Sequence, residues 1–161
     1  MKPTGPIPIL WAAFGAAVGS TVVELLLWWI VGDDAMHNLL RDARLTAAIA
    51  MGRRALGSST GFDPVIMGVA TLAHAALSLA YAAVLAKAIR GLSLGPALVV
   101  GGVFGLVLYG VNLYGFTAIF PWFVQVRGGI TLIAHVVFGI TATAVHHVAR
   151  LGTRSNRPAN R

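Results

Sequence analysis

The chain has no cysteine, and this absence removes three kinds of chemistry at once. It can form no disulfide bond, it cannot hold a metal ion through thiolates, and it cannot use a thiol as a catalytic nucleophile. Any metal ligand or reactive group must therefore come from other side chains.

Charged residues are also scarce, and acidic ones most of all. Only 11% of the 161 residues are charged, with 12 Lys and Arg against 5 Asp and Glu, so the formal net charge is +7. A basic chain can bind nucleic acid, but here the basic residues lie at the ends of apolar segments and near the C-terminus, not along one polar face with aromatic residues between them. We therefore expect no nucleic-acid partner, and anionic lipid head groups are the expected counterpart.

Common catalytic motifs give no support for an enzyme. The sequence has no H-E-x-x-H zinc motif, no phosphate-binding loop and no G-x-G-x-x-G fingerprint after a strand. It predicts a protein that is not an enzyme.

Long apolar segments make up more than half of the chain. The composition is 57% apolar and the mean hydropathy is +0.80. A run of 18 or more apolar residues matches the roughly 30 Å hydrocarbon layer of a bilayer. The sequence thus predicts an all-α integral membrane protein, a four-helix bundle forming a single domain at 1–150, followed by a polar cytoplasmic tail at 151–161. The predicted spans are about 7–31, 64–88, 96–117 and 129–149.

Two glycine pairs have the spacing that lets membrane helices approach closely. Gly15 and Gly19 lie in the first span, and Gly101 and Gly105 lie in the third. We expect both pairs at helix contacts, within this chain or between copies in a homo-oligomer.

The segment 33–56, between the first two spans, has the pattern of an amphipathic helix. It begins with two acids and ends with Arg53 and Arg54, charges that complement a helix dipole. We expect an external helix at the membrane interface, and the alternative is a hydrophilic loop with a helical turn. Its predicted apolar side consists of Met36, Leu40, Ala43, Ala47 and Met51.

Basic residues indicate the orientation of the chain. They flank both termini and the loop between the second and third spans, where the sequence has Lys87 and Arg90. By the positive-inside rule, both termini are expected in the cytoplasm and segment 33–56 outside.

Each apolar segment contains one strongly polar residue, and these are the candidate site: Glu24, His74, Asn112 and His135. Such groups in a membrane normally face the bundle interior and mark functional sites. At 1.5 Å per residue, all four fall roughly 9 to 15 Å from the outer ends of their spans, so they are expected to form one layer. Supporting positions on the same helix faces are Ser20, Thr71, Ser78, Tyr81 and Tyr109.

The four residues allow several kinds of chemistry. Glu24 and the two histidines could exchange protons or bind a cation, with Asn112 orienting them, as expected for passage or binding of a proton, cation or small solute. His74 and His135 could instead be axial ligands of a b-type haem. Glu24 with either histidine could bind a divalent metal. The structural alternatives are a hydrogen bond that fixes helix register and a non-catalytic subunit of a larger membrane complex.

The order of these features resembles a known group. An acid late in the first span, His74 followed by Ser78, the pair Pro121 and Trp122, and His135 early in the fourth span resemble the YagU-like group of small bacterial inner-membrane proteins. The chain is also similar to short proteobacterial proteins labelled sodium/proline symporters. This resemblance implies a bacterial inner membrane and four unbroken spans, but no settled activity. Asn112 stands where the YagU-like pattern would have a histidine.

Overall fold

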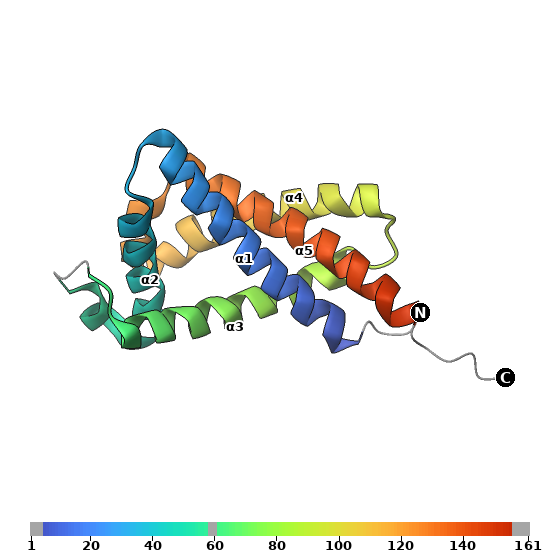
Figure 1. Ribbon diagram of the computed structural model, residues 1–161, viewed down its shortest axis with the longest axis horizontal. Coiled ribbons are helices and arrows are strands. Elements are labelled where there is room, and N and C mark those ends of the chain that lie inside the picture. Colours follow the sequence, from blue (N-terminus) through green and yellow to red (C-terminus); the bar gives the residue numbers. More distant parts are fainter. Residues whose placement is uncertain (1–4, 58–60, 156–161) are drawn as a thin grey trace.

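The computed structural model describes residues 5–57 and 61–155, and this part of the chain consists of helices with no strand (Figure 1). The expected all-α membrane bundle is confirmed, because four helices are long and apolar enough to cross a bilayer. These spans are Pro6–Val31, Pro64–Ala88, Leu94–Ala118 and Gly129–Gly152.

The helices begin and end at residues suited to those positions. α1 (Pro6–Val31) has proline at its start and is followed by Gly32, whose φ of 83° favours glycine. α3 (Pro64–Ala88) starts after Asp63, whose Oδ1 accepts hydrogen bonds from the backbone N–H groups of Val65 and Ile66.

The third span changes its helical geometry near its end. α4 (Leu94–Gly110) is followed by a π-helical turn, η2 (Val111–Gly115), and a short 3₁₀ turn, η3 (Phe116–Ala118). The sequence predicts one unbroken helix to Thr117, so this change is a difference from expectation. A π turn inserts an extra residue into the helix and is frequent at functional sites, and this one carries Asn112.

Both glycine pairs lie at contacts with α5 (Gly129–Ser155), as predicted. An added Cβ on Gly15 would lie 3.0 Å from Cγ2 of Val145, and one on Gly19 would lie 3.3 Å from Cγ2 of Thr141. The contact of α4 with α5 is tighter still, because a Cβ on Gly101 or Gly105 would overlap the α5 backbone. α5 therefore packs between α1 and α4 with close backbone approach on the α4 side.

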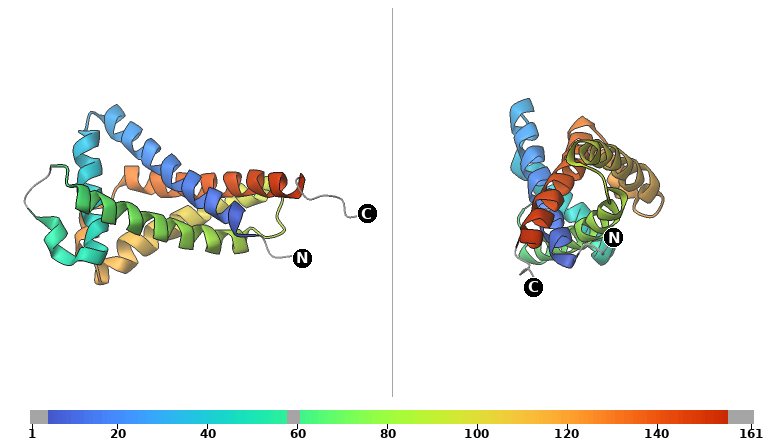
Figure 2. Two further views of the ribbon diagram at one scale, coloured as in Figure 1. Left: turned by 60° about the horizontal axis from the view of Figure 1, so that its bottom comes forward. Right: turned by 90° about the vertical axis from the view of Figure 1, so that its right-hand side faces the viewer.

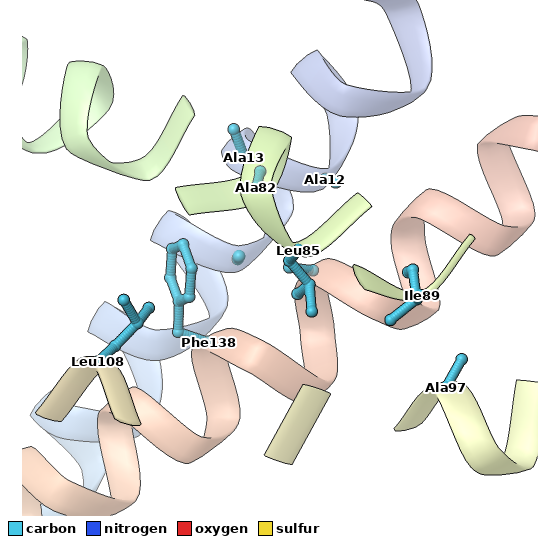
Figure 3. Packing of buried hydrophobic residues seen from close by; sticks show 10 residues of the cluster. Ala12, Ala13, Ala82, Leu85, Ile89, Ala97, Leu108 and Phe138 are labelled. Carbon is cyan, nitrogen blue, oxygen red and sulfur yellow. The ribbon is translucent and has the colours of Figure 1, made fainter. Parts of the chain in front are cut away.

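A core cluster of small and apolar side chains joins the four spans (Figure 3). Alanines from α1 face Leu85 of α3, while Leu108 of α4 packs near Phe138 of α5. All members of the core cluster are buried, and they are Ala12, Ala13, Ala16, Ala82, Leu85, Ile89, Ala97, Leu108, Phe138 and Ala142.

α2 (Ala35–Met51) crosses one end of the bundle (Figure 1). With the 3₁₀ turn η1 (Gly52–Leu56), it packs against the start of α3, where Ala47 and Ala48 lie with Ile66 in a second buried cluster. Of the predicted apolar side, Ala47 is buried against protein, whereas Met36 is 60% exposed. Trp122 in η4 (Pro121–Val126) reinforces this contact by donating from Nε1 to the carbonyl of Leu45 at 3.1 Å.

The start of α1 and the end of α5 lie at the opposite end of the bundle from α2 (Figures 1 and 2). This is the arrangement expected for four crossings. α5 continues to Ser155, beyond the predicted end of the span at 149 and into the segment predicted as a tail, of which residues 156–161 lie outside the described part.

Candidate functional site

The centre of the site is a contact between Asn112 in η2 and His135 in α5. Nδ2 of Asn112 lies 3.3 Å from Nε2 of His135, and Nδ1 of His135 lies 2.7 Å from the carbonyl oxygen of Thr131. A carbonyl can only accept, so Nδ1 carries the hydrogen, and Nε2 of the neutral ring accepts from the Asn112 amide. Tyr81 fixes the amide in this orientation, because its hydroxyl donates to Oδ1 of Asn112 at 2.7 Å.

Aromatic rings pack beside the contact between Asn112 and His135. The ring of Tyr109 packs edge-on against His135 with centroids 5.7 Å apart, and its hydroxyl accepts a hydrogen bond from the backbone N–H of Gly128 at 3.2 Å. Tyr81 packs edge-on against Phe138, with centroids 6.4 Å apart. Both tyrosines predicted as supporting residues therefore contact the site.

Glu24 joins the site from α1 through Thr131. The Thr131 hydroxyl donates to Oε1 of Glu24 at 3.3 Å, while the Thr131 carbonyl accepts from His135. Glu24 also lies within electrostatic range of Arg41 and Asp42 on α2. A polar series thus runs from Tyr81 through Asn112, His135 and Thr131 to Glu24, and on to α2.

Arg41 and Asp42 form an ion pair on the side of α2 nearest Glu24. Nε of Arg41 donates to Oδ1 of Asp42 at 2.7 Å, and the Arg41 guanidinium lies over the Trp28 ring, 6.0 Å from its centroid. Burial raises the pKa of Asp42 above its ordinary value, and the neighbouring Arg41 opposes this change in part. Sequence reasoning gave these two residues no role in the site.

His74 completes the predicted set, but it lies in a different environment. It is close enough to His135 for the two rings to interact electrostatically. Its neighbours on the same face of α3, Ala70 and Ser78, are 5% and 4% exposed, whereas His74 itself is exposed. The described residues therefore leave the His74 side chain uncovered, between two residues of α3 that are buried.

The site is consequently not sealed within the core. Glu24, Asn112 and His135 are half-buried and His74 is exposed, so the expected burial of these groups is only partial. Groups that exchange protons with their surroundings need such access.

Two predicted supporting residues form their hydrogen bonds within their own helices and not with the site. The hydroxyl of Ser20 donates to the carbonyl of Ala17, and that of Thr71 donates to the carbonyl of Met67. Thr71 is also exposed. Serine and threonine in helices commonly bond to the carbonyl one turn back, so their support of the site is indirect at most.

Arg127 is a further residue that sequence reasoning missed. Nε of Arg127 donates to the carbonyl of Leu113 at 2.7 Å, and an NH2 group donates to the hydroxyl of Thr117 at 3.0 Å. Its guanidinium also lies 4.2 Å from the ring centroid of Tyr114. Arg127 therefore holds the end of the third span beside the π turn that carries Asn112. In the sequence, the feature that could have indicated this role is a single arginine that follows an aromatic segment.

His146 is buried in the C-terminal half of α5. It is 1% exposed, and neither ring nitrogen has a hydrogen-bond partner among residues 5–57 and 61–155. Along α5, Phe138 and Ala142 of the core cluster lie between His135 and His146. The polar series and His146 are thus separated by an apolar layer.

The described residues do not fit the metal and haem alternatives. Among them, no group of three or more His, Asp or Glu side chains is placed to hold a metal ion. An axial haem ligand needs one free ring nitrogen, but both nitrogens of His135 face protein partners, Asn112 and Thr131.

One short catalytic motif is present in the sequence without the structural context that it needs. The pattern G-x-S-x-G of hydrolase nucleophiles occurs twice, at 57–61 and at 91–95. The serine of the first match lies outside the described residues. In the second match, Ser93 precedes α4 and follows helix α3, whereas the hydrolase motif lies between a strand and a helix.

The contacts among Glu24, Thr131, His135, Asn112 and Tyr81 are what define the candidate site. The likeness to the YagU-like group remains an expectation from short sequence motifs. Comparisons of this chain with protein-family models, with curated proteins and with solved structures found no match.

Proposed function

We propose that this membrane protein binds and passes a proton at the site formed by Glu24 and His135. The observation that supports the proposal is the series of hydrogen bonds from Tyr81 to Glu24, which joins α3, η2, α5 and α1 in one half of the bundle. Half-buried ionisable groups that partner one another are typical of proton relays in membranes.

Only some members of the series can carry a proton. Glu24 and His135 take up and release protons readily, whereas the Asn112 amide and the Thr131 carbonyl hold their partners in position. His74 lies within electrostatic range of His135 and provides a second imidazole, which is exposed.

Protonation of His135 requires Asn112 to turn. In the neutral state Nε2 of His135 accepts from Nδ2 of Asn112, but a protonated Nε2 needs an acceptor. Rotation of the amide by half a turn would present Oδ1 to His135 and Nδ2 to Tyr81, whose oxygen can accept. The Tyr81 hydroxyl then needs a new acceptor, so the proton on His135 changes the whole series.

Passage beyond the site depends on the apolar layer. The next group toward the inner end that can accept a proton is His146, about 16 Å further along α5. Phe138 and Leu108 of the core cluster lie in between, so water or a side-chain movement must connect the two regions. This layer would prevent a continuous leak when the site is at rest.

The test is proton flux into liposomes that contain the purified protein and a pH-sensitive dye. Glu24→Gln removes the carboxylate with almost no change of shape, and we expect it to reduce flux to the level of empty liposomes. Asp33→Asn is the matched control, because it also removes one acidic charge near the end of α1 but lies exposed outside the series. Circular dichroism checks that both variants fold.

Unchanged flux in Glu24→Gln would contradict the proposal. A second measurement uses a sodium-sensitive dye and a sodium gradient, with equal pH on both sides of the membrane. It distinguishes passage of a proton from passage of another small cation. Entry of sodium that is lost in Glu24→Gln would show that the Glu24 carboxylate binds sodium and not a proton.

A further inference from the structure

The described part of the chain contains a buried positive charge without a negative partner, on α2 at the end of the bundle nearest the site. Arg44 of α2 is only 9% exposed. Its two terminal amino groups donate to the backbone carbonyls of Gly61 at 2.7 Å and Ala55 at 3.5 Å. The salt bridge within residues 5–57 and 61–155 joins Arg41 to Asp42 and does not include Arg44.

Such a charge is costly unless an anion compensates it. Neutral carbonyls accept hydrogen bonds from a guanidinium but leave its net charge in place. A guanidinium has five N–H donors, and two carbonyls do not satisfy them all. The guanidinium of Arg44 can therefore donate further hydrogen bonds to an anionic ligand.

A cavity of about 160 Å³ adjoins this charge. Its polar lining consists of Arg44, Arg41, His37 and Gln125, and its apolar lining includes Leu45 and Leu56. None of these side chains is a carboxylate, so the lining offers many N–H donors and no fixed negative charge. His37 and Gln125 are exposed, which leaves the cavity accessible from outside.

We propose that this cavity binds a phosphate group. Guanidinium groups match the geometry of phosphate oxygens, and Nε of Arg41 is held by Asp42 so that its terminal amino groups remain for a ligand. A cavity of about 150 Å³ accepts a ligand as large as benzene, so a phosphate fits. α2 and η4 place the cavity at the end of the bundle, where the head groups of a bilayer would lie.

The phosphate could belong to a lipid head group or to a free anion, and one experiment separates these sources. Binding of inorganic phosphate to the full-length protein is measured by titration calorimetry in an uncharged detergent. The same titration is repeated in nanodiscs of phosphatidylcholine and in nanodiscs with added phosphatidylglycerol. Weaker binding in either nanodisc than in detergent assigns the site to a lipid phosphodiester, and equal binding in detergent and in both nanodiscs assigns it to free phosphate.

The informative variant is Gln125→Glu, which places a carboxylate in the cavity at an exposed position with almost no change of shape. We expect it to weaken phosphate binding about tenfold or more, because a like charge opposes the ligand. Ser93→Asp is the control, since it adds the same charge at the start of α4, where aspartate is a favourable cap. Arg44 itself is less suitable, because its bonds to Gly61 and Ala55 also hold the chain between α2 and α3.

Saturable binding that falls in Gln125→Glu and persists in Ser93→Asp would support the phosphate site. Absence of binding in detergent and in both nanodiscs would overturn it, as would equal binding by the two variants. This result is independent of the proton flux, because neither variant touches Glu24 or His135.

Discussion

The hydroxyl of Thr131 donates a 3.3 Å hydrogen bond to Oε1 of Glu24, a residue 107 positions earlier in the chain. The carbonyl of the same Thr131 accepts from His135. One residue of α5 therefore contacts both Glu24 and His135, the first through its side chain and the second through its backbone.

Replacement of Thr131 by valine separates these two roles. Thr131→Val keeps the shape of the side chain and the carbonyl that binds His135, but it removes the donor to Glu24. A hydrogen bond to a charged group contributes about 1.5 to 3 kcal/mol, so we expect proton flux to fall about tenfold or more while the fold persists. Liposome flux is the measurement. Thr141→Val on the same helix is the control, and an equal loss in both variants would contradict the assignment.

The glycines of α4 provide a prediction about stability. A Cβ on Gly105 would overlap the carbonyl of His135, whereas one on Gly102 would make an ordinary 3.8 Å contact with Ile140. We expect Gly105→Ala to destabilise the protein by about 2 kcal/mol or more. Gly102→Ala should be neutral or slightly stabilising, because alanine favours a helix.

Unfolding of both variants in detergent micelles, followed by circular dichroism, checks this difference. Gly105→Ala should also lower proton flux, because it forces α5 away from η2 and lengthens the contact between His135 and Asn112. Equal stability of the two alanine variants would show that the close approach of α4 and α5 is not required.

Asp42 provides a prediction about pH. Burial raises its pKa above the ordinary value of 3.8, and Arg41 only partly opposes this change. The folded state thus binds the proton more tightly than the unfolded state, so this residue favours folding most below its ordinary pKa. Its contribution is lost as pH rises through the raised pKa.

Asp42→Asn should remove this dependence and leave the protein more stable than the wild type near neutral pH. Thermal unfolding of both proteins from about pH 4 to pH 8 measures the effect, and groups that titrate equally in both cancel in the difference. A difference that stays constant over this range, or that grows in favour of the wild type as pH rises, would contradict it.

The sequence predicted features that depend on local pattern. The spans follow from apolar runs of sufficient length, and the contacts at Gly15, Gly19, Gly101 and Gly105 follow from small residues one turn apart. The depth of the polar residues follows from helix rise, and this explains why Asn112 meets His135.

Features that depend on which helices are neighbours were not predicted. Thr131 becomes a link only because α5 packs on α1, and His146 is buried only because other helices surround the C-terminal half of α5. The π turn at Val111–Gly115 likewise has no pattern of its own, since Tyr81, His135 and Arg127 fix its side chains and carbonyls from other elements.

The absence of cysteine makes the orientation of the protein directly testable. Arg53→Cys in η1 and Ser93→Cys before α4 each introduce a single thiol at an exposed position, at opposite ends of the bundle. The positive-inside rule places the loop of Ser93 in the cytoplasm. A membrane-impermeant maleimide added to right-side-out vesicles should therefore label Arg53→Cys, and it should label Ser93→Cys only after detergent is added. The reverse pattern would place Glu24 and the cavity beside Arg44 at the cytoplasmic face, so that protons would enter the site from the cell interior.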